Sequence, residues 1–412
     1  MKRKKMYRKL AALAVRRGVN VQPGQPLVVR ADVRDYPFIE MVAEEAYQAG
    51  ASYVDVRWRN QNITRMDYLN QSEEELADIG DWVHEREKQA HEKGACYLSV
   101  VSDRPGSLKG IPSSKINAYQ KAYHEKMGDL QAYTMNNEGQ WCVLGTASKE
   151  WAKAVFPELD EEEAFDKLEA VLFDVSGVSE EGDPLEYWKA HDAELIAHAK
   201  KMTEFGFKEL HFRNSLGTDL HVGLVNEHIW VGGGCTTPAG VYFDPNIPTE
   251  EVFCMPHREK VNGTVVSSRP LSYNGVLIEN FTLKFENGKV VSHHAEKEEE
   301  ALTQLLDFDE GSRHLGEVAL VPHGSKISQS GILFYNTLYD ENASCHLALG
   351  RPYPENIKGG EEMSPEELRE KGGNASLQHE DFMFGTADMS VDGIMHDGKV
   401  IPVFRDGSFV ID

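Results

Sequence analysis

Carboxylates and imidazoles gather in short apolar segments of the last third of the chain, where they could do chemistry together. They are Glu317 in 317–321, His346 in 344–349, and His379 and Asp381 in 377–384, with Glu250 and Glu251 upstream in 248–253. Side chains of a strand alternate between its faces, so His379 and Asp381 share one face and Glu380 points to the other. Acidic and imidazole groups are costly to bury among apolar residues unless something compensates them. A divalent metal ion is the simplest compensation.

The mixture of ligand types favours one class of metal site. Carboxylate oxygens and imidazole nitrogens, without thiolates, suit Zn, Co, Mn or Mg better than a Cys-rich structural zinc site. A lone histidine in a strand is more often a core residue than a metal ligand. Several histidines and carboxylates in one region of the chain are not explained as core residues. A single catalytic zinc needs only three protein ligands, so the surplus favours a pair of metal ions.

Other motifs of catalytic proteins fail on inspection. A helical zinc motif needs a second histidine four residues after the first. The pairs His84-Glu85, His91-Glu92 and His124-Glu125 are followed at that position by Lys88, Ala95 and Gly128. The glycines 232–234 lead into Thr236-Thr-Pro-Ala-Gly instead of a helix, so they do not form a phosphate loop. Cys345 beside His346 is interpreted as a small buried residue next to a ligand.

The composition is that of an acidic globular protein, with 412 residues, 41% hydrophobic and 27% charged, and a net charge of -24. Such a charge argues against a nucleic-acid partner, which needs clustered positive charge. No segment approaches the ~18 apolar residues of a membrane span, so no membrane partner is expected. The five cysteines are odd in number and contain no CxxC pair, which favours reduced thiols and a cytoplasmic protein.

The elements that must position these residues fall into two halves of different texture. In the first half, an amphipathic N-terminal helix precedes a βαβ unit, with strands at 27–30 and 52–58 around a helix at 36–49 that Gly50 stops. Strands at 95–101 and 140–144 continue the alternation. This pattern predicts an open α/β sheet as the N-terminal domain, residues 1–190.

The second half begins after a helical region that runs from Glu158 to about Phe205. Short β segments with Gly and Asn turns follow, and Asn287-Gly288 predicts a hairpin. An acidic helix at 298–306 and a polar excursion at 354–373 interrupt them. We therefore expect a mixed, β-rich α+β catalytic domain over residues 191–412, which would hold the metal ligands.

Four of these segments resemble the metal motifs of the M29 aminopeptidases, also called the aminopeptidase T/S family. They are 246–253, 316–321, 341–350 and 379–385. The similarity extends over nearly the whole chain, including Pro23-Gly-Gln-Pro-Leu-Val28. Cys254 is a local departure, since Thr is usual at that position in the family, and it puts only local packing in doubt.

The resemblance implies a set of site residues. The metal ligands would be Glu251, Glu317, His346, His379 and Asp381, and the active-site tyrosine would be Tyr353. Between the adjacent glutamates the family pattern selects Glu251, which the residues alone do not. Glu250 or Glu380 is a candidate proton shuttle, although alternation predicts that Glu380 faces away from the metals.

The function that follows is a metal-dependent aminopeptidase that releases N-terminal residues from peptides through a two-metal-activated water. Tyr353 would hydrogen-bond the oxyanion. The resemblance also implies a homodimer that acts on peptides with a free N-terminus. Two alternatives stay open: a metal-dependent amidase or deacylase acting on non-peptide substrates, and an inactive homologue that only binds metal.

Overall fold

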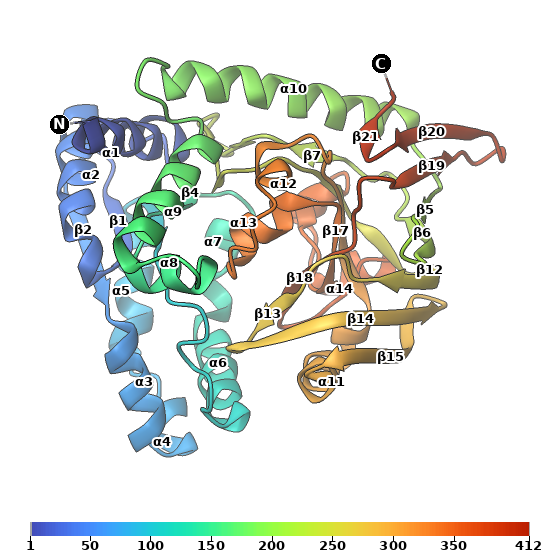
Figure 1. Cartoon of the computed structure of the whole chain (residues 1–412), viewed down its shortest axis with the longest axis horizontal. Helices are drawn as coiled ribbons and strands as arrows, with labels where there is room; N and C mark the ends of the chain where they lie inside the picture. Colours follow the sequence, from blue (N-terminus) through green and yellow to red (C-terminus); the bar gives the residue numbers. More distant parts are fainter. Residues whose placement is uncertain (1, 412) are drawn as a thin grey trace. The chain divides into compact units, whose positions relative to one another are not determined.

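The computed structural model describes residues 2–411, which form two compact units (Figure 1). The first unit comprises the chain up to His191 and Gly234–Pro248, and the second comprises Asp192–Gly233 and the chain from Thr249 onward. The segment Gly234–Pro248 thus returns to the first unit after the second has begun. The division into an α/β domain of residues 1–190 and a catalytic domain of residues 191–412 stays a prediction.

The first unit is built on a parallel sheet with the strand order β10-β4-β3-β1-β2. Its strands are β1 (Leu27–Asp32), β2 (Val54–Arg59), β3 (Cys96–Val101), β4 (Trp141–Gly145) and β10 (Asn246–Ile247). β1 is buried almost throughout, as expected of a strand covered on both faces. A two-stranded ladder of β8 (Cys235–Thr236) and β9 (Tyr242–Phe243) belongs to the same unit.

Helices flank these strands, and the last of them continues into the second unit. They are α1 (Lys2–Leu13), α2 (Tyr36–Ala49), α3 (Gln61–Asn70), α4 (Glu73–Ala77), α5 (Asp81–Glu92), α6 (Ser113–Met127), α7 (Ala132–Met135), α8 (Lys149–Val155), α9 (Glu161–Val175) and α10 (Pro184–Phe205). α2 ends at Gly50, whose φ of 99° is the left-handed conformation that glycine adopts without steric cost. The helical region predicted from Glu158 to Phe205 consists of α9 and α10, separated by a turn at Gly177 (φ 68°).

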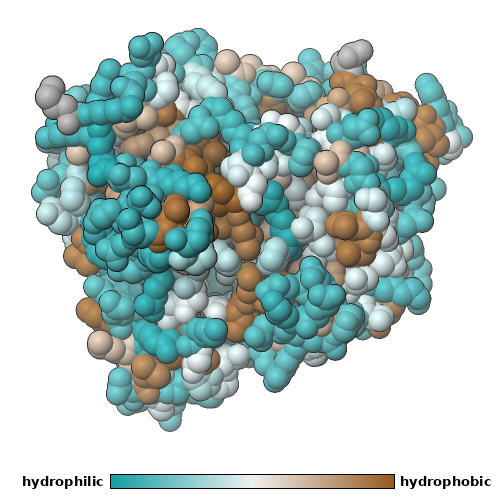
Figure 2. All heavy atoms as spheres, viewed as in Figure 1, coloured by the Kyte–Doolittle hydropathy of each residue, from teal (hydrophilic) through white to brown (hydrophobic). Residues whose placement is uncertain are grey.

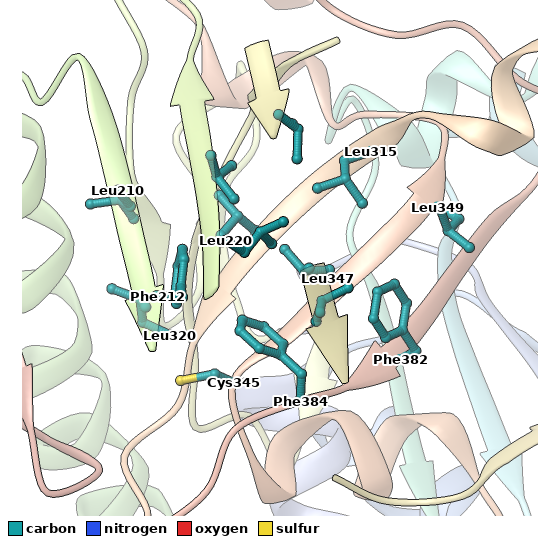
Figure 3. Packing of buried hydrophobic residues seen from close by; sticks show 14 of the residues in the cluster. Leu210, Phe212, Leu220, Leu315, Leu320, Cys345, Leu347, Leu349, Phe382 and Phe384 are labelled. Carbon is teal, nitrogen blue, oxygen red and sulfur yellow. The ribbon is translucent and has the colours of Figure 1, made fainter. Parts of the chain in front are cut away.

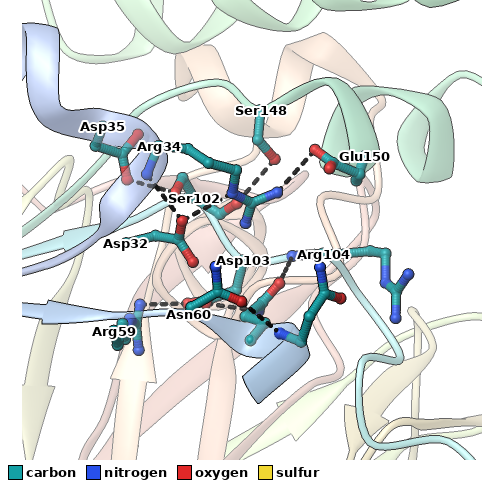
Figure 4. A network of polar contacts seen from close by, with 12 residues as sticks. Asp32, Arg34, Asp35, Arg59, Asn60, Ser102, Asp103, Arg104, Ser148 and Glu150 are labelled. Atoms are coloured by element: carbon teal, nitrogen blue, oxygen red, sulfur yellow. Dashed lines mark hydrogen bonds and ion pairs between the residues drawn. The ribbon is translucent and has the colours of Figure 1, made fainter. Parts of the chain in front are cut away.

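Polar side chains join the carboxyl ends of neighbouring strands in this unit (Figure 4). Asp35, just after β1, accepts hydrogen bonds from the hydroxyls of Ser102 (2.6 Å) and Thr146 (2.9 Å), which follow β3 and β4. Arg34 lies between Asp32 and Glu150, at 2.8 Å from each. The burial of Asp35 is therefore compensated within the unit.

The second unit contains two antiparallel sheets. The larger follows the order β13-β14-β12-β6-β5-β19-β20-β21, with β15 paired to β14. Its strands are β5 (Glu209–Arg213), β6 (Asp219–Leu224), β12 (Pro256–Val266), β13 (Leu271–Tyr273), β14 (Val276–Glu286), β15 (Lys289–Lys297), β19 (Ser390–Ile394), β20 (Val400–Arg405) and β21 (Ser408–Phe409). The predicted hairpin at Asn287-Gly288 is confirmed, and both residues have positive φ, as a type I′ turn requires.

The smaller sheet has the order β18-β17-β16-β11-β7 and carries the predicted metal ligands. Its strands are β7 (Val231–Gly232), β11 (Val252–Cys254), β16 (Leu315–Leu320), β17 (His346–Gly350) and β18 (His379–Met383). One face contributes Leu320, Leu347, Leu349 and Phe382 to the hydrophobic core of the unit (Figure 3). The prediction of an α/β first half and a β-rich α+β second half is confirmed.

Short helices complete the second unit: α11 (Glu299–Leu306), α12 (Lys326–Ser330), α13 (Thr337–Asp340) and α14 (Pro365–Glu370). α11 is the predicted acidic helix, and α14 lies within the predicted polar excursion. Over residues 2–411, no helix combines the length and apolar character needed to span a bilayer. The face drawn in Figure 2 is mostly hydrophilic, with scattered apolar side chains.

Candidate metal centre

The smaller sheet of the second unit separates apolar from ligating side chains by strand alternation. The register pairs Glu317 of β16 with Ala348 of β17, and Ala348 with Asp381 of β18. Directly paired residues of antiparallel strands share a face, so the two carboxylates flank Ala348 on one side of the sheet. The methyl group of Ala348 is short enough to leave room above the sheet for both carboxylates.

The predicted ligands come together on that face. Glu317 lies on β16, His346 begins β17, and His379 and Asp381 lie on β18. Glu251 lies one residue before β11, just outside the strand. Glu251, Glu317, His346 and Asp381 are buried, and the His379 side chain is 21% exposed.

These residues form two groups that share one carboxylate. Glu251, Glu317 and His346 make one group, and Glu317, His379 and Asp381 make the other. His346 Nε2 lies 2.8 Å from Glu251 Oε2 and 3.4 Å from Glu317 Oε1. His379 Nε2 lies 3.5 Å from Glu317 Oε2 and 3.4 Å from Asp381 Oδ1. The two oxygens of Glu317 therefore face different histidines, as in a bridging carboxylate.

Backbone carbonyl groups orient both histidines. Nδ1 of His346 is 3.2 Å from the Ser344 carbonyl oxygen, and Nδ1 of His379 is 2.6 Å from that of Arg351. When Nδ1–H donates to a carbonyl, the neutral ring presents an unprotonated Nε2, which is the arrangement of metal-binding histidines. Both rings direct that Nε2 toward carboxylates.

Unpaired acceptors show that the residues fit a metal ion. Glu251 Oε2 and Asp381 Oδ1 are buried without a hydrogen-bond donor. In the neutral tautomer, Nε2 of His346 is also an acceptor, so its approach to Glu251 needs a cation nearby. Metal–ligand bonds of about 2.0–2.2 Å place neighbouring ligand atoms roughly 2.9–3.5 Å apart, close to the separations in this centre.

The pKa shifts have the same physical origin. Burial first, and then the negative charges of Asp381 and Glu251, raise the pKa of Glu317 to about 7 against the opposing effect of His346. Burial alone would lower the pKa of His379, but Asp381 and Glu317 outweigh it and raise the value to about 9. Concentrated negative charge thus holds positive charge at this face, which a metal ion also supplies.

Glu341 is a fourth acidic group at this centre that sequence reasoning missed. Its pKa is raised well above the usual value by burial and then by Asp381 and Glu251. It also hydrogen-bonds Asp381, which lowers the pKa of the aspartate. Its position at the start of the segment 341–350, five residues before His346, was the available signal.

Tyr353 and Glu380, two of the predicted catalytic residues, take different places. The ring of Tyr353 lies 5.0 Å from that of His379, and burial together with Glu317 and Asp381 raises its pKa. Glu380 has its pKa raised to about 8 by burial and Asp381, and it in turn raises the pKa of Tyr273. It belongs to neither ligand group, as strand alternation predicts.

Glu250 is positioned through Asn342, a fully buried side chain. The backbone N–H of Glu250 donates to Asn342 Oδ1 at 2.7 Å, and Asn342 Nδ2 donates to the Leu338 carbonyl at 2.9 Å. Asn342 thereby links the segment of Glu250 and Glu251 to that of Glu341. Cys254 lies in the apolar core on the other face of the sheet, away from the ligands.

Comparisons with known proteins identify the family of the whole chain. The chain matches the family described as Thermophilic metalloprotease (M29) over residues 3–409. It is 45% identical to aminopeptidase AmpS of Bacillus subtilis over 97% of both chains, and 41% identical to aminopeptidase T of Thermus aquaticus over 98% of both. The solved structure of wild-type AmpT from Thermus thermophilus is similar with a TM-score of 0.92 and 40% identity, covering 99% of this chain and 100% of that one.

Proposed function

The chain belongs to the thermophilic metalloprotease (M29) family and is a metalloaminopeptidase, and we propose that the shared carboxylate of Glu317 organises its reaction centre. Glu251 and His346 would complete one ion site, and His379 and Asp381 the other. The single observation that carries this proposal is that Glu317 Oε1 faces His346 while Oε2 faces His379. A carboxylate that bridges two sites is the simplest account of that arrangement.

The donor set supports two divalent ions, drawn from Zn, Co, Mn and Mg, with nitrogen and oxygen ligands. Bound there, such ions activate a water molecule and polarise the scissile carbonyl group. Glu251, Glu317 and Asp381 supply three negative charges against four positive ones. The remaining positive charge favours a substrate oxygen that becomes negative during the reaction.

Tyr353 would donate its hydroxyl proton to that oxygen. Its raised pKa keeps the phenol protonated at neutral pH, which a hydrogen-bond donor requires. The ring contacts with His379 and Phe253, at centroid distances of 5.0 and 5.7 Å, hold the phenol beside the ligands. Tyr353 is thus placed to stabilise charge that develops in the transition state.

Glu341 is a further candidate for proton transfer beside Glu250. Burial, and then the charges of Asp381 and Glu251, raise its pKa, which favours the protonated carboxyl group, and its hydrogen bond to Asp381 joins it to the ligand set. A group that can take up a proton from water and release it to the departing amine suits peptide hydrolysis. Glu380 is associated with Tyr273 instead, so we do not assign it this role.

The proposal includes a homodimer in the cytoplasm that acts on peptides with a free N-terminus. All five cysteines lie among the described residues, buried and outside any disulfide, as expected of a protein in a reducing compartment. Gel filtration with light scattering should give about twice the mass of one chain. A mass of one chain at working concentrations would remove the dimer from the proposal.

The test of substrate class uses leucine-p-nitroanilide and N-acetyl-leucine-p-nitroanilide with metal-stripped protein. Restoring Co²⁺ or Zn²⁺ should restore cleavage of the free-amine substrate only. Equal cleavage of the acetylated substrate would instead favour the amidase or deacylase alternative. Absence of cleavage in protein shown to hold metal would favour a binding role.

A further inference from the structure

A second cluster of ligating side chains lies on the larger sheet of the second unit, away from the smaller sheet that carries the proposed centre. It consists of Glu209 and His211 on β5 and of Asp219 and His221 on β6. The strand register pairs His211 directly with His221, so both rings leave the same face of the sheet. Leu210 and Phe212, which alternate with them, point into the core.

Three members of the cluster have ligand atoms close together. Ligand atoms of His211, Asp219 and His221 lie within 4.8 Å of one another. His211 Nε2 is 2.6 Å from Asp219 Oδ1, and His221 Nδ1 is 2.6 Å from Glu209 Oε1. The two imidazole rings are stacked, with centroids 3.8 Å apart. Four potential donors therefore stand on two adjacent strands.

Charge and donor type define the ion that this cluster would hold. Two carboxylates and two neutral imidazoles carry a formal charge that matches one divalent cation. Imidazole nitrogen favours Zn²⁺, Ni²⁺ or Cu²⁺ over Ca²⁺ and Mg²⁺, which prefer oxygen ligands alone. The nearby cation Arg213 forms its ion pair with Asp392, although it is also the register partner of Asp219.

The side chains have the freedom that binding requires. Stacked rings direct their nitrogen lone pairs nearly parallel, so a shared ion needs at least one ring to turn about its Cβ–Cγ bond. The His221 side chain is 40% exposed and that of Asp219 is 71% exposed, which permits this rotation. Because of the same exposure, the metal ion would bind reversibly and more weakly than at a buried site.

We propose that His211, Asp219 and His221 form a peripheral binding site for one transition-metal ion such as Zn²⁺, with Glu209 orienting the His221 ring. The ion would link β5 to β6 on the solvent-facing side of the sheet and stabilise the second unit. This site is independent of the proposed reaction centre, with which it shares no residue.

The test compares wild-type protein with His221→Ala and with His294→Ala after chelation and zinc titration by calorimetry. His294 is a matched control, since it is 72% exposed on a strand and its Nδ1 also contacts a carboxylate, that of Glu299. Wild type and His294→Ala should bind one more zinc ion per chain than His221→Ala. Part of the zinc-induced rise in Tm should also be lost in His221→Ala alone.

Equal zinc stoichiometry in wild type and His221→Ala would overturn the proposal, as would an equal loss in His294→Ala, which would indicate unspecific surface binding. Both variants should hydrolyse leucine-p-nitroanilide like wild type, because neither changes the proposed centre. A failure of that centre would lower ion binding in all three proteins and leave the difference between them intact.

Discussion

At the scale of single residues, the two oxygens of Glu317 face different imidazoles, and Nδ1 of each ring is held by a backbone carbonyl. The sequence predicts that His379 and Asp381 lie on the same face of their strand, because the alternation of side chains depends only on neighbouring residues. The sequence does not predict that Glu317, Ala348 and Asp381 lie in one row across the sheet, because their strands are far apart in the chain. Glu341 was missed for a related reason. It lies in a 3-10 turn, where no regular alternation of side chains predicts the direction of the carboxylate.

Tyr353→Phe tests the role of a single hydroxyl group. The phenylalanine keeps the ring contacts with His379 and Phe253 but removes the donor to the developing oxyanion. We expect kcat to fall by about 10²–10³-fold, the usual loss for one such donor. Metal content, measured by atomic emission, should stay at the wild-type value. Wild-type turnover in the fully metallated variant would contradict this role.

At the scale of elements, the flat apolar core behind β16, β17 and β18 fixes which face the ligands occupy. The first half of the fold follows from short-range patterns such as the apolar run of β1 and the stop at Gly50. The long strands β12 and β14 were not predicted at their full length. A register shift within β12 and the left-handed residues Gly263 and Asn280 interrupt their alternation.

Ala348→Val tests the space that β17 leaves between Glu317 and Asp381. The added methyl groups would stand in the row of the two carboxylates and push them apart. We expect metal affinity to fall roughly 10–100-fold, as for other changes beside ligands. Ala348→Ser adds one atom and should lose much less. Competition with a chelating dye measures both variants, and equal affinities would contradict the account.

Glu87 of α5 joins three strands of the first unit to one helix. Its carboxylate accepts hydrogen bonds from Arg30 of β1 (2.9 Å), Arg57 of β2 and Tyr97 of β3 (3.0 Å). Burial alone would raise the pKa of Glu87, but Arg30 and Arg57 outweigh it and lower the value below 4.5. The stability that the charge contributes is therefore complete above about pH 4.5 and is lost as the pH falls through the folded-state pKa.

Glu87→Gln should therefore destabilise the protein by roughly 1–3 kcal/mol at pH 7, the usual loss for hydrogen bonds to a charged group. Urea unfolding should show that the difference from wild type shrinks at pH 4. Glu85→Gln, an exposed neighbour on α5, should change stability little at either pH. If the free energy of unfolding of Glu87→Gln falls further below that of wild type toward pH 4, the pKa of Glu87 is raised by folding and not lowered.

At the scale of the whole molecule, the ligand groups all belong to the second unit. Among residues 2–411, the candidate metal clusters lie on its two sheets, and the first unit contributes none. Metal binding should therefore stabilise the second unit first when both units are followed separately, for example by hydrogen exchange. The return of Gly234–Pro248 to the first unit was not predicted, because two residues of β10 carry too little pattern to assign a partner.

The bridging role of Glu317 is tested most directly by counting the ions that three proteins bind. The parent protein carries His221→Ala alone, which removes the peripheral site, and the other two add Glu251→Gln or Glu317→Gln to it. Cobalt content and hydrolysis of leucine-p-nitroanilide would be measured on the same samples. The account predicts two ions in the parent and about one in Glu251→Gln. In Glu317→Gln both ions should be weakened together, with loss of hydrolysis. A single ion in the parent, or two firmly bound ions in an active Glu317→Gln protein, would contradict a centre bridged by Glu317.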